Sequence, residues 1–83
     1  MADAPEIIVY TRPGCPFSAM LLADLRANEL PFGLIDIWQD RDAAAAVRAV
    51  ADGNEVVPTV NVGAIWLVNP SVEEVRGALA EAA

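Results

Sequence analysis

Histidine and lysine are both absent from this 83-residue chain, and cysteine occurs once, as Cys15. Without an imidazole, the chain lacks the general base of His-assisted serine and cysteine hydrolases and the commonest nitrogen ligand of zinc. Without lysine, it lacks the amine that forms Schiff bases. A single thiol allows neither an internal disulfide nor a Cys-x-x-Cys zinc site, whereas small secreted domains usually carry several disulfides. We therefore expect a cytoplasmic protein that holds no metal ion.

Basic side chains are scarce too, because 12 acidic residues stand against 5 arginines and the formal net charge is −7. A nucleic-acid duplex would repel such a chain. The segment 1–10 contains acids and no base, unlike a signal peptide. No apolar run approaches the about 18 residues of a membrane-spanning helix. We therefore expect neither nucleic acid nor membrane as a partner, and with 55% hydrophobic residues we expect one folded domain, residues 1–83.

Hydrophobic periodicity predicts the element order β-α-β-α-β-β-α. The predicted strands are residues 6–10, 32–37, 56–62 and 65–68, and the predicted helices are residues 16–28, 43–51 and a last helix after residue 71. The first two strands should pair in parallel through their connecting helix, and the last two should form an antiparallel hairpin. This order predicts an α/β domain with a mixed four-stranded sheet and helices on both faces.

The predicted helices carry signals at their ends and apolar residues at helical spacing. Asp40 or Asp42 can cap the second helix, and Ser71 with Glu74 has the spacing of a capping box. Four residues of the first helix have three- and four-residue spacing and predict one apolar face: Phe17, Met20, Leu21 and Leu25. Caps and faces agree on the same element boundaries, which strengthens the predicted order.

Cys15 lies between a glycine turn and the first turn of the first predicted helix. Unpaired N–H groups at a helix start carry partial positive charge. Arg12 can add a full charge, and Ser18, one helical turn later, can donate a hydrogen bond to the sulfur. Each of these favours the thiolate. A lone cysteine is most often a small buried hydrophobe, but this position after Arg-Pro-Gly favours a reactive thiol.

The segment from Val9 to Ser18, Val-Tyr-Thr-Arg-Pro-Gly-Cys-Pro-Phe-Ser, resembles the active-site segment of glutaredoxins. Val57-Pro58 resembles the Val-Pro of that family, in which the proline is cis and faces the catalytic sulfur. Residues 53–60 and 67–75 are more similar still to mycoredoxins, the glutaredoxin-like proteins that handle mycothiol. The likeness covers nearly the whole chain and implies the thioredoxin fold.

The resemblance implies thiol–disulfide exchange, with Cys15 as the nucleophile and Ser18 beside it. It implies substrate binding by six further residues: Arg12, Pro16, Phe17, Val57, Pro58 and Ser71. It further implies a monomer without a bound cofactor, whose partners are client proteins in mixed disulfides and a small thiol as co-substrate. The second active-site cysteine of the family is replaced by Ser18, which favours a monothiol mechanism. Asn69-Pro70-Ser71 replaces a glycine pair that helps to hold glutathione, which favours mycothiol.

Two other functions stay open at this point. Cys15, Phe17 and Ser18 match the Cys-Gly-Phe-Ser tetrad of monothiol glutaredoxins that bridge a [2Fe–2S] cluster, but Pro16 replaces the glycine and ranks this reading lower. The chain can also be a redox-silent binding module of the same fold that merely retains Cys15. Asp36 has no assigned role from the sequence beyond a surface charge.

Overall fold

The structure is a computed structural model that describes residues 6–82. Its elements are β1 (Ile7–Thr11), α1 (Pro16–Ala27), β2 (Gly33–Asp36), α2 (Arg41–Val50), β3 (Thr59–Val62), β4 (Ile65–Val68) and α3 (Val72–Ala82). The predicted order is confirmed. The largest difference in bounds is at β3, which begins at Thr59 rather than Val56. Pro58 has no N–H to donate to a neighbouring strand, so the regular ladder begins after it.

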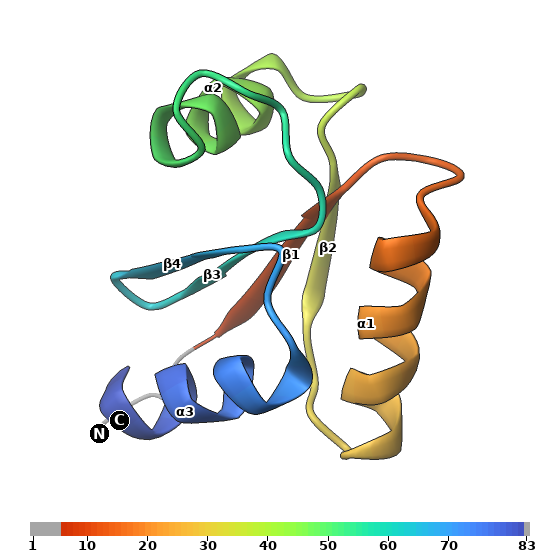
Figure 1. Cartoon of the computed structure of the whole chain (residues 1–83), viewed down its shortest axis with the longest axis vertical. Helices are drawn as coiled ribbons and strands as arrows, with labels where there is room; N and C mark the ends of the chain where they lie inside the picture. Colours follow the sequence, from red (N-terminus) through yellow and green to blue (C-terminus); the bar gives the residue numbers. More distant parts are fainter. Residues whose placement is uncertain (1–5, 83) are drawn as a thin grey trace.

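The four strands form one sheet in the order β2-β1-β3-β4. β1 pairs in parallel with β2 and antiparallel with β3, and β3 and β4 form the antiparallel hairpin that the sequence predicts. β1 is central, and Val9 lies beside Leu34 of β2 and Val60 of β3. The carboxyl end of β1 therefore lies between the end of β2 and the start of β3 (Figure 1).

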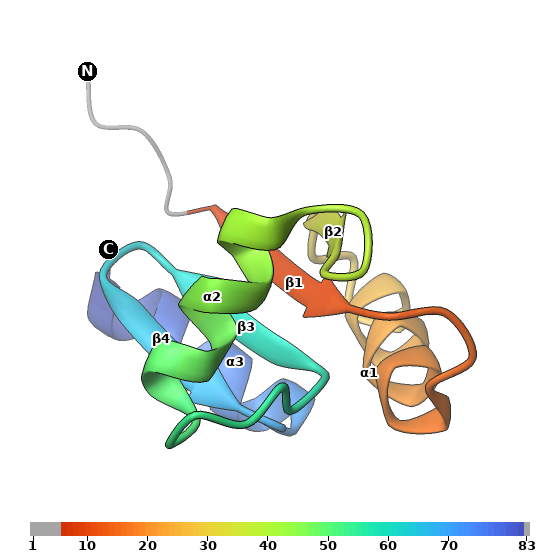
Figure 2. The ribbon, with the colours of Figure 1, turned by 90° about the horizontal axis from the view of Figure 1, so that it is seen from above.

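The helices cover both faces of the sheet, as predicted. α1 and α3 pack on one face against a core that includes Val9, Val60 and Val75, each of which is fully buried. α2 packs on the other face, where Val47 meets Val57. Figure 2 shows α2 in front of the sheet and α3 behind it. Side chains alternate between the two faces along each strand, so the sheet has one hydrophobic core on each face.

The buried face of α1 is narrower than the sequence suggests. Leu21 and Leu25 are buried, but Phe17 and Met20 are 62% and 66% exposed. The buried stripe is formed by Ser18, Leu21 and Leu25. Because each helical residue turns about 100° from the last, Phe17 lies beside this stripe and Met20 lies about 100° from Leu21, toward solvent. The prediction of a single apolar face was wrong for these two residues.

Two predicted caps are present. The Asp40 carboxylate accepts a hydrogen bond from the Ala43 backbone N–H at 3.0 Å, which selects Asp40 over Asp42 as the cap of α2. The Ser71 hydroxyl accepts from the Glu74 N–H at 3.2 Å, and the Glu74 carboxylate accepts from the Ser71 N–H at 2.9 Å. These contacts set the starts of α2 and α3. Between residues 6 and 82, no helix has the length and apolar character needed to span a bilayer.

Candidate active site

Cys15 is the N-cap residue of α1, and Pro16 is the first helical residue. Proline suits that position because its missing N–H would have no partner in the helix. Gly14, in the turn before Cys15, has φ +78°, a left-handed conformation that favours glycine. The Cys15 carbonyl accepts from the Ala19 N–H at 3.1 Å, while its side chain makes no cap bond. The thiol is therefore at the helix start and half-exposed.

Several groups around the sulfur act on its acidity. Desolvation raises the pKa of the Cys15 thiol and is the largest single effect, but it is outweighed by hydrogen bonds. The Ser18 hydroxyl and the backbone N–H groups of Ser18 and Phe17 stabilise the thiolate, and the Arg12 charge adds a smaller contribution. The net result is a Cys15 pKa below the ordinary value. A larger fraction of this thiol is ionised at neutral pH than in a free cysteine.

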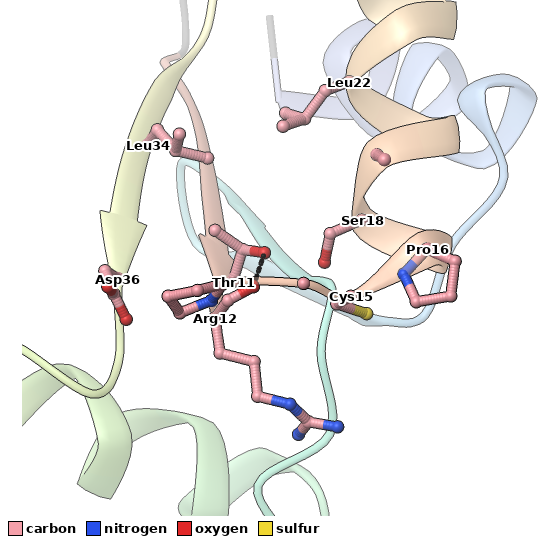
Figure 3. A pocket seen from close by; sticks show the side chains of 11 residues that line it. Thr11, Arg12, Cys15, Pro16, Ser18, Leu22, Leu34 and Asp36 are labelled. Carbon is pink, nitrogen blue, oxygen red and sulfur yellow. Dashed lines mark hydrogen bonds between the residues drawn. The ribbon is translucent and has the colours of Figure 1, made fainter.

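Ser18 has an unusual environment. It is 3% exposed, and its Oγ has no hydrogen-bond partner within residues 6–82. Figure 3 shows this oxygen on the side of α1 that faces the Cys15 backbone. A buried hydroxyl without a partner costs about 1–3 kcal/mol. Ionisation of the thiol supplies an anionic acceptor, so the same hydroxyl then stabilises the charged sulfur.

The segment before β3 contacts the sulfur from the other side. The Val57-Pro58 peptide bond is cis, as the resemblance implied. The Cys15 thiol donates to the Val57 carbonyl, with 3.6 Å between sulfur and oxygen. The Pro58 carbonyl accepts a hydrogen bond from the Asn69 N–H at 2.8 Å. This bond holds the β4–α3 connection next to the Val57-Pro58 segment. Ser71 follows two residues later, with its hydroxyl engaged in the cap of α3.

Three other predicted site residues lie near Cys15 and are at least partly exposed. Pro16 and Phe17 are exposed in the first turn of α1. Arg12 is half-buried, and Figure 3 shows its guanidinium extending away from α1. In the described part of the chain the single ion pair joins Arg48 and Glu55, at 2.6 Å, so the Arg12 charge has no carboxylate partner there.

A groove of about 610 Å³ opens between α1 and β2, and we call it the α1–β2 groove. Its lining includes four predicted site residues, Arg12, Cys15, Pro16 and Ser18. The remaining lining residues are Thr11, Pro13, Gly14, Ala19, Leu22, Leu34 and Asp36. Sequence reasoning missed the part of this lining that belongs to β2. The sequence offered one indication of this lining, the apolar residue Leu34 in the second predicted strand. Only the structure shows that this strand lies at an edge of the sheet. Within residues 6–82 no cluster of three or more His, Cys, Asp or Glu side chains is present.

Comparison with known proteins shows what this arrangement is similar to. A family model described as Glutaredoxin matches residues 7–64, which include Cys15 and Pro58. A protein of Mycobacterium tuberculosis named "Putative glutaredoxin" is 36% identical over 78 residues, which are 93% of each chain. Mycoredoxin 1 of Corynebacterium glutamicum is 40% identical over 55 residues, 66% of this chain and 67% of that protein.

Solved structures show the same fold. A solution structure of glutaredoxin from Brucella melitensis superposes with a TM-score of 0.71 at 25% identity, over 98% of this chain and 91% of the other. The holo form of glutaredoxin C1 from Populus tremula x tremuloides superposes with a TM-score of 0.67 at 17% identity, over 93% and 85% of the two chains. The predicted thioredoxin fold is thus confirmed.

Proposed function

This chain belongs to the glutaredoxin family, and we propose that it reduces mixed disulfides between client proteins and a small thiol through Cys15 alone. The family makes it a thiol–disulfide oxidoreductase. The observation that carries the proposal is the Cys15 thiol at the start of α1, half-exposed, with a lowered pKa and 3.6 Å from the Val57 carbonyl. The single cysteine of the sequence supports a monothiol route, because Cys15 has no second thiol with which to form an intramolecular disulfide.

The reaction has two exchange steps. The Cys15 thiolate attacks the small-thiol sulfur of the mixed disulfide, a new sulfur–sulfur bond forms, and the client cysteine leaves as a thiolate that takes up a proton. A second small thiol then attacks the small-thiol sulfur bound to Cys15. The products are the oxidised small thiol and the Cys15 thiolate. Each step exchanges one sulfur–sulfur bond for another, so the small thiol supplies all the reducing electrons.

A low thiol pKa acts mainly on the second step. A free thiol of pKa about 8.5 is roughly 3% ionised at neutral pH, so complete ionisation gains about 30-fold. Nucleophilicity falls with basicity along a slope of about 0.4–0.5, which offsets much of that gain. The same low basicity makes Cys15 a better leaving group when the second thiol attacks. The Ser18 hydroxyl, which stabilises the thiolate, therefore assists departure of Cys15.

The residues around Val57 suit the small thiol. The backbone of Val57, beside Pro58, can pair with amide groups of a small thiol as a short strand does. Arg12, whose guanidinium has no carboxylate partner among residues 6–82, can bind oxygen atoms of the small thiol, and Pro16, Phe17 and Ser71 lie nearby. Mycothiol is favoured over glutathione because Asn69-Pro70-Ser71 stands where glutathione-binding members carry glycines. The similarity to Mycoredoxin 1 supports the same choice.

Mass spectrometry tests this function directly. The protein is exposed to oxidised mycothiol or oxidised glutathione, the adduct on Cys15 is identified, and turnover of a mixed disulfide is measured with each reduced thiol. We expect an adduct on Cys15, faster turnover with mycothiol, and no turnover by a Cys15→Ser variant. A wild-type protein that forms no adduct and turns over neither mixed disulfide would disprove the proposal.

A further inference from the structure

The α1–β2 groove extends well beyond the sulfur. Its wall on α1 runs from Cys15 to Leu22, about 10 Å of helix at about 1.5 Å per residue. An extended peptide covers that length with about three residues. Leu22 lies across the groove from Leu34 in Figure 3, and Leu34 is 53% exposed. The groove is thus long enough and apolar enough for a peptide segment next to a reacting cysteine.

The groove and the Val57-Pro58 segment lie on opposite sides of Cys15. Cys15 follows β1, the groove opens toward β2, and Pro58 leads into β3, while the sheet order places β1 between those two strands. Neither Val57 nor Pro58 lines the groove. A mixed disulfide has two halves. If the small thiol binds beside Val57, the groove is the free side for the other half, the client protein.

The edge of β2 can hold such a segment by its backbone. The Ile37 N–H donates to the Thr11 carbonyl at 2.8 Å, so this part of β2 bonds to β1 at odd-numbered residues. Backbone groups alternate sides along a strand, so those of Leu34 point to the outer edge. β2 is the end strand of the described sheet, and no strand of residues 6–82 pairs with that edge. Pairing with an exposed strand edge is a recurrent mode of peptide recognition.

Charge selects the kind of segment. Asp36 lines the groove near the sulfur end, beside the apolar Leu34. Its carboxylate accepts from the Trp38 N–H at 2.9 Å and forms no ion pair within the described residues. The chain as a whole carries a net charge of −7. Arg12 lines the groove as well, but its guanidinium extends away from α1 in Figure 3. A basic residue of the client therefore complements Asp36, and an apolar residue complements the Leu22–Leu34 end.

We propose that the α1–β2 groove binds an extended client segment, with a basic residue beside Asp36 and an apolar residue against Leu34. The proposal rests on the proposed function, because it assigns the client half of the same mixed disulfide. The chemistry is unchanged: as the bond between Cys15 and the small thiol forms, the client sulfur leaves as a thiolate within this groove. Specificity among clients then depends on residues that do not contact the small thiol.

Kinetics with synthetic substrates test the groove. The peptide Leu-Val-Arg-Cys-Arg-Val-Leu keeps arginine and leucine two residues apart, as Asp36 and Leu34 are on β2. Disulfide-linked to glutathione or mycothiol, it is compared with a version that has serine for leucine and with a cysteine–small-thiol disulfide that has no peptide. We expect Leu34→Glu to lower kcat/KM for the first peptide about tenfold relative to the peptide-free substrate, equivalent to about 1.4 kcal/mol. Met20→Glu adds the same charge on an exposed α1 residue outside the groove, and should not change that ratio. An unchanged ratio in Leu34→Glu would overturn the proposal.

The charge preference is tested in parallel. A third peptide has glutamate in place of both arginines, and we expect the wild type to favour the arginine peptide. Asp36→Asn should narrow that preference while the serine-for-leucine discrimination persists. A preference that is the same in wild type and Asp36→Asn would contradict the assigned basic position.

Binding without turnover separates this proposal from the proposed function. The leucine peptide with serine for its cysteine is titrated into ¹⁵N-labelled wild-type protein. Amide shifts centred on Leu22, Leu34 and Asp36 support the groove even if no mixed disulfide is reduced. Shifts centred on Val57 and Ser71, or none at millimolar peptide, overturn it even if Cys15 is a proficient reductant.

Discussion

Replacing Ser18 by alanine should make the folded protein more stable and its thiol less acidic. While Cys15 is protonated, the Ser18 Oγ is buried without a partner among the described residues. Removing it relieves a cost of about 1–3 kcal/mol, and alanine is also the better helix former. At the low end of that range, Tm should rise by about 4–8 °C in a domain of this size. The variant also loses a hydrogen bond that lowers the Cys15 pKa, so that pKa should rise.

The gain in stability should depend on pH with a defined sign. The folded-state pKa of Cys15 is lowered below the unfolded value, which is about 8.5. The stabilisation due to the thiolate is therefore fully present above the unfolded pKa and is lost as pH falls through the lowered folded pKa. Wild-type stability should rise with pH across that window because of this group. In Ser18→Ala the rise should be smaller, so the stability advantage of the variant should shrink from pH 5 to pH 9.

Calorimetry at several pH values and the rate of iodoacetamide alkylation between pH 4 and pH 9 measure the two effects. Ser71→Ala is the matched control, because Ser71 also stands at a helix start but its hydroxyl accepts a bond from the Glu74 N–H. That variant should lose about 0.5–2 kcal/mol of stability and leave the alkylation profile of Cys15 unchanged. A lower Tm for Ser18→Ala at pH 5, or an alkylation profile identical to wild type, would refute the reasoning.

Three further outcomes are expected. Leu25→Ala should cost about 2–5 kcal/mol in urea unfolding, because the side chain is fully buried beneath α1; a cost under 1 kcal/mol would contradict its place in the core. Asp40→Ala should cost about 0.5–2 kcal/mol by the same measurement, because the carboxylate caps α2, and Asp42→Ala should cost less; equal costs would argue against the assigned cap. Arg12→Gln should slow alkylation of Cys15 at pH 6 in low salt, with the difference shrinking in 1 M salt, since the Arg12 effect is Coulombic; a salt-independent difference would point to a lost contact instead.

Local features of the sequence were sufficient for the element order and for the position of the thiol. The capping box of Ser71 and Glu74 needs four consecutive residues and no distant partner. The placement of Cys15 before Pro16 predicts a helix start for the same reason. Phe17 and Met20 show where that reasoning ends. Periodicity marks a face of a helix, but it does not tell how wide a strip the neighbouring sheet and helix will cover.

Chain-local physics alone thus determined the helices, the strands and a cysteine with unpaired N–H groups beside it. The partners of that cysteine were decided by tertiary structure. Val57 is 42 positions after Cys15 in the sequence and contacts the sulfur only because β3 pairs with β1. Leu34 and Asp36 line the groove because β2 is an edge strand of the described sheet and lies next to α1. Strand order is set by which apolar faces pack together in three dimensions, and no single segment contains that information.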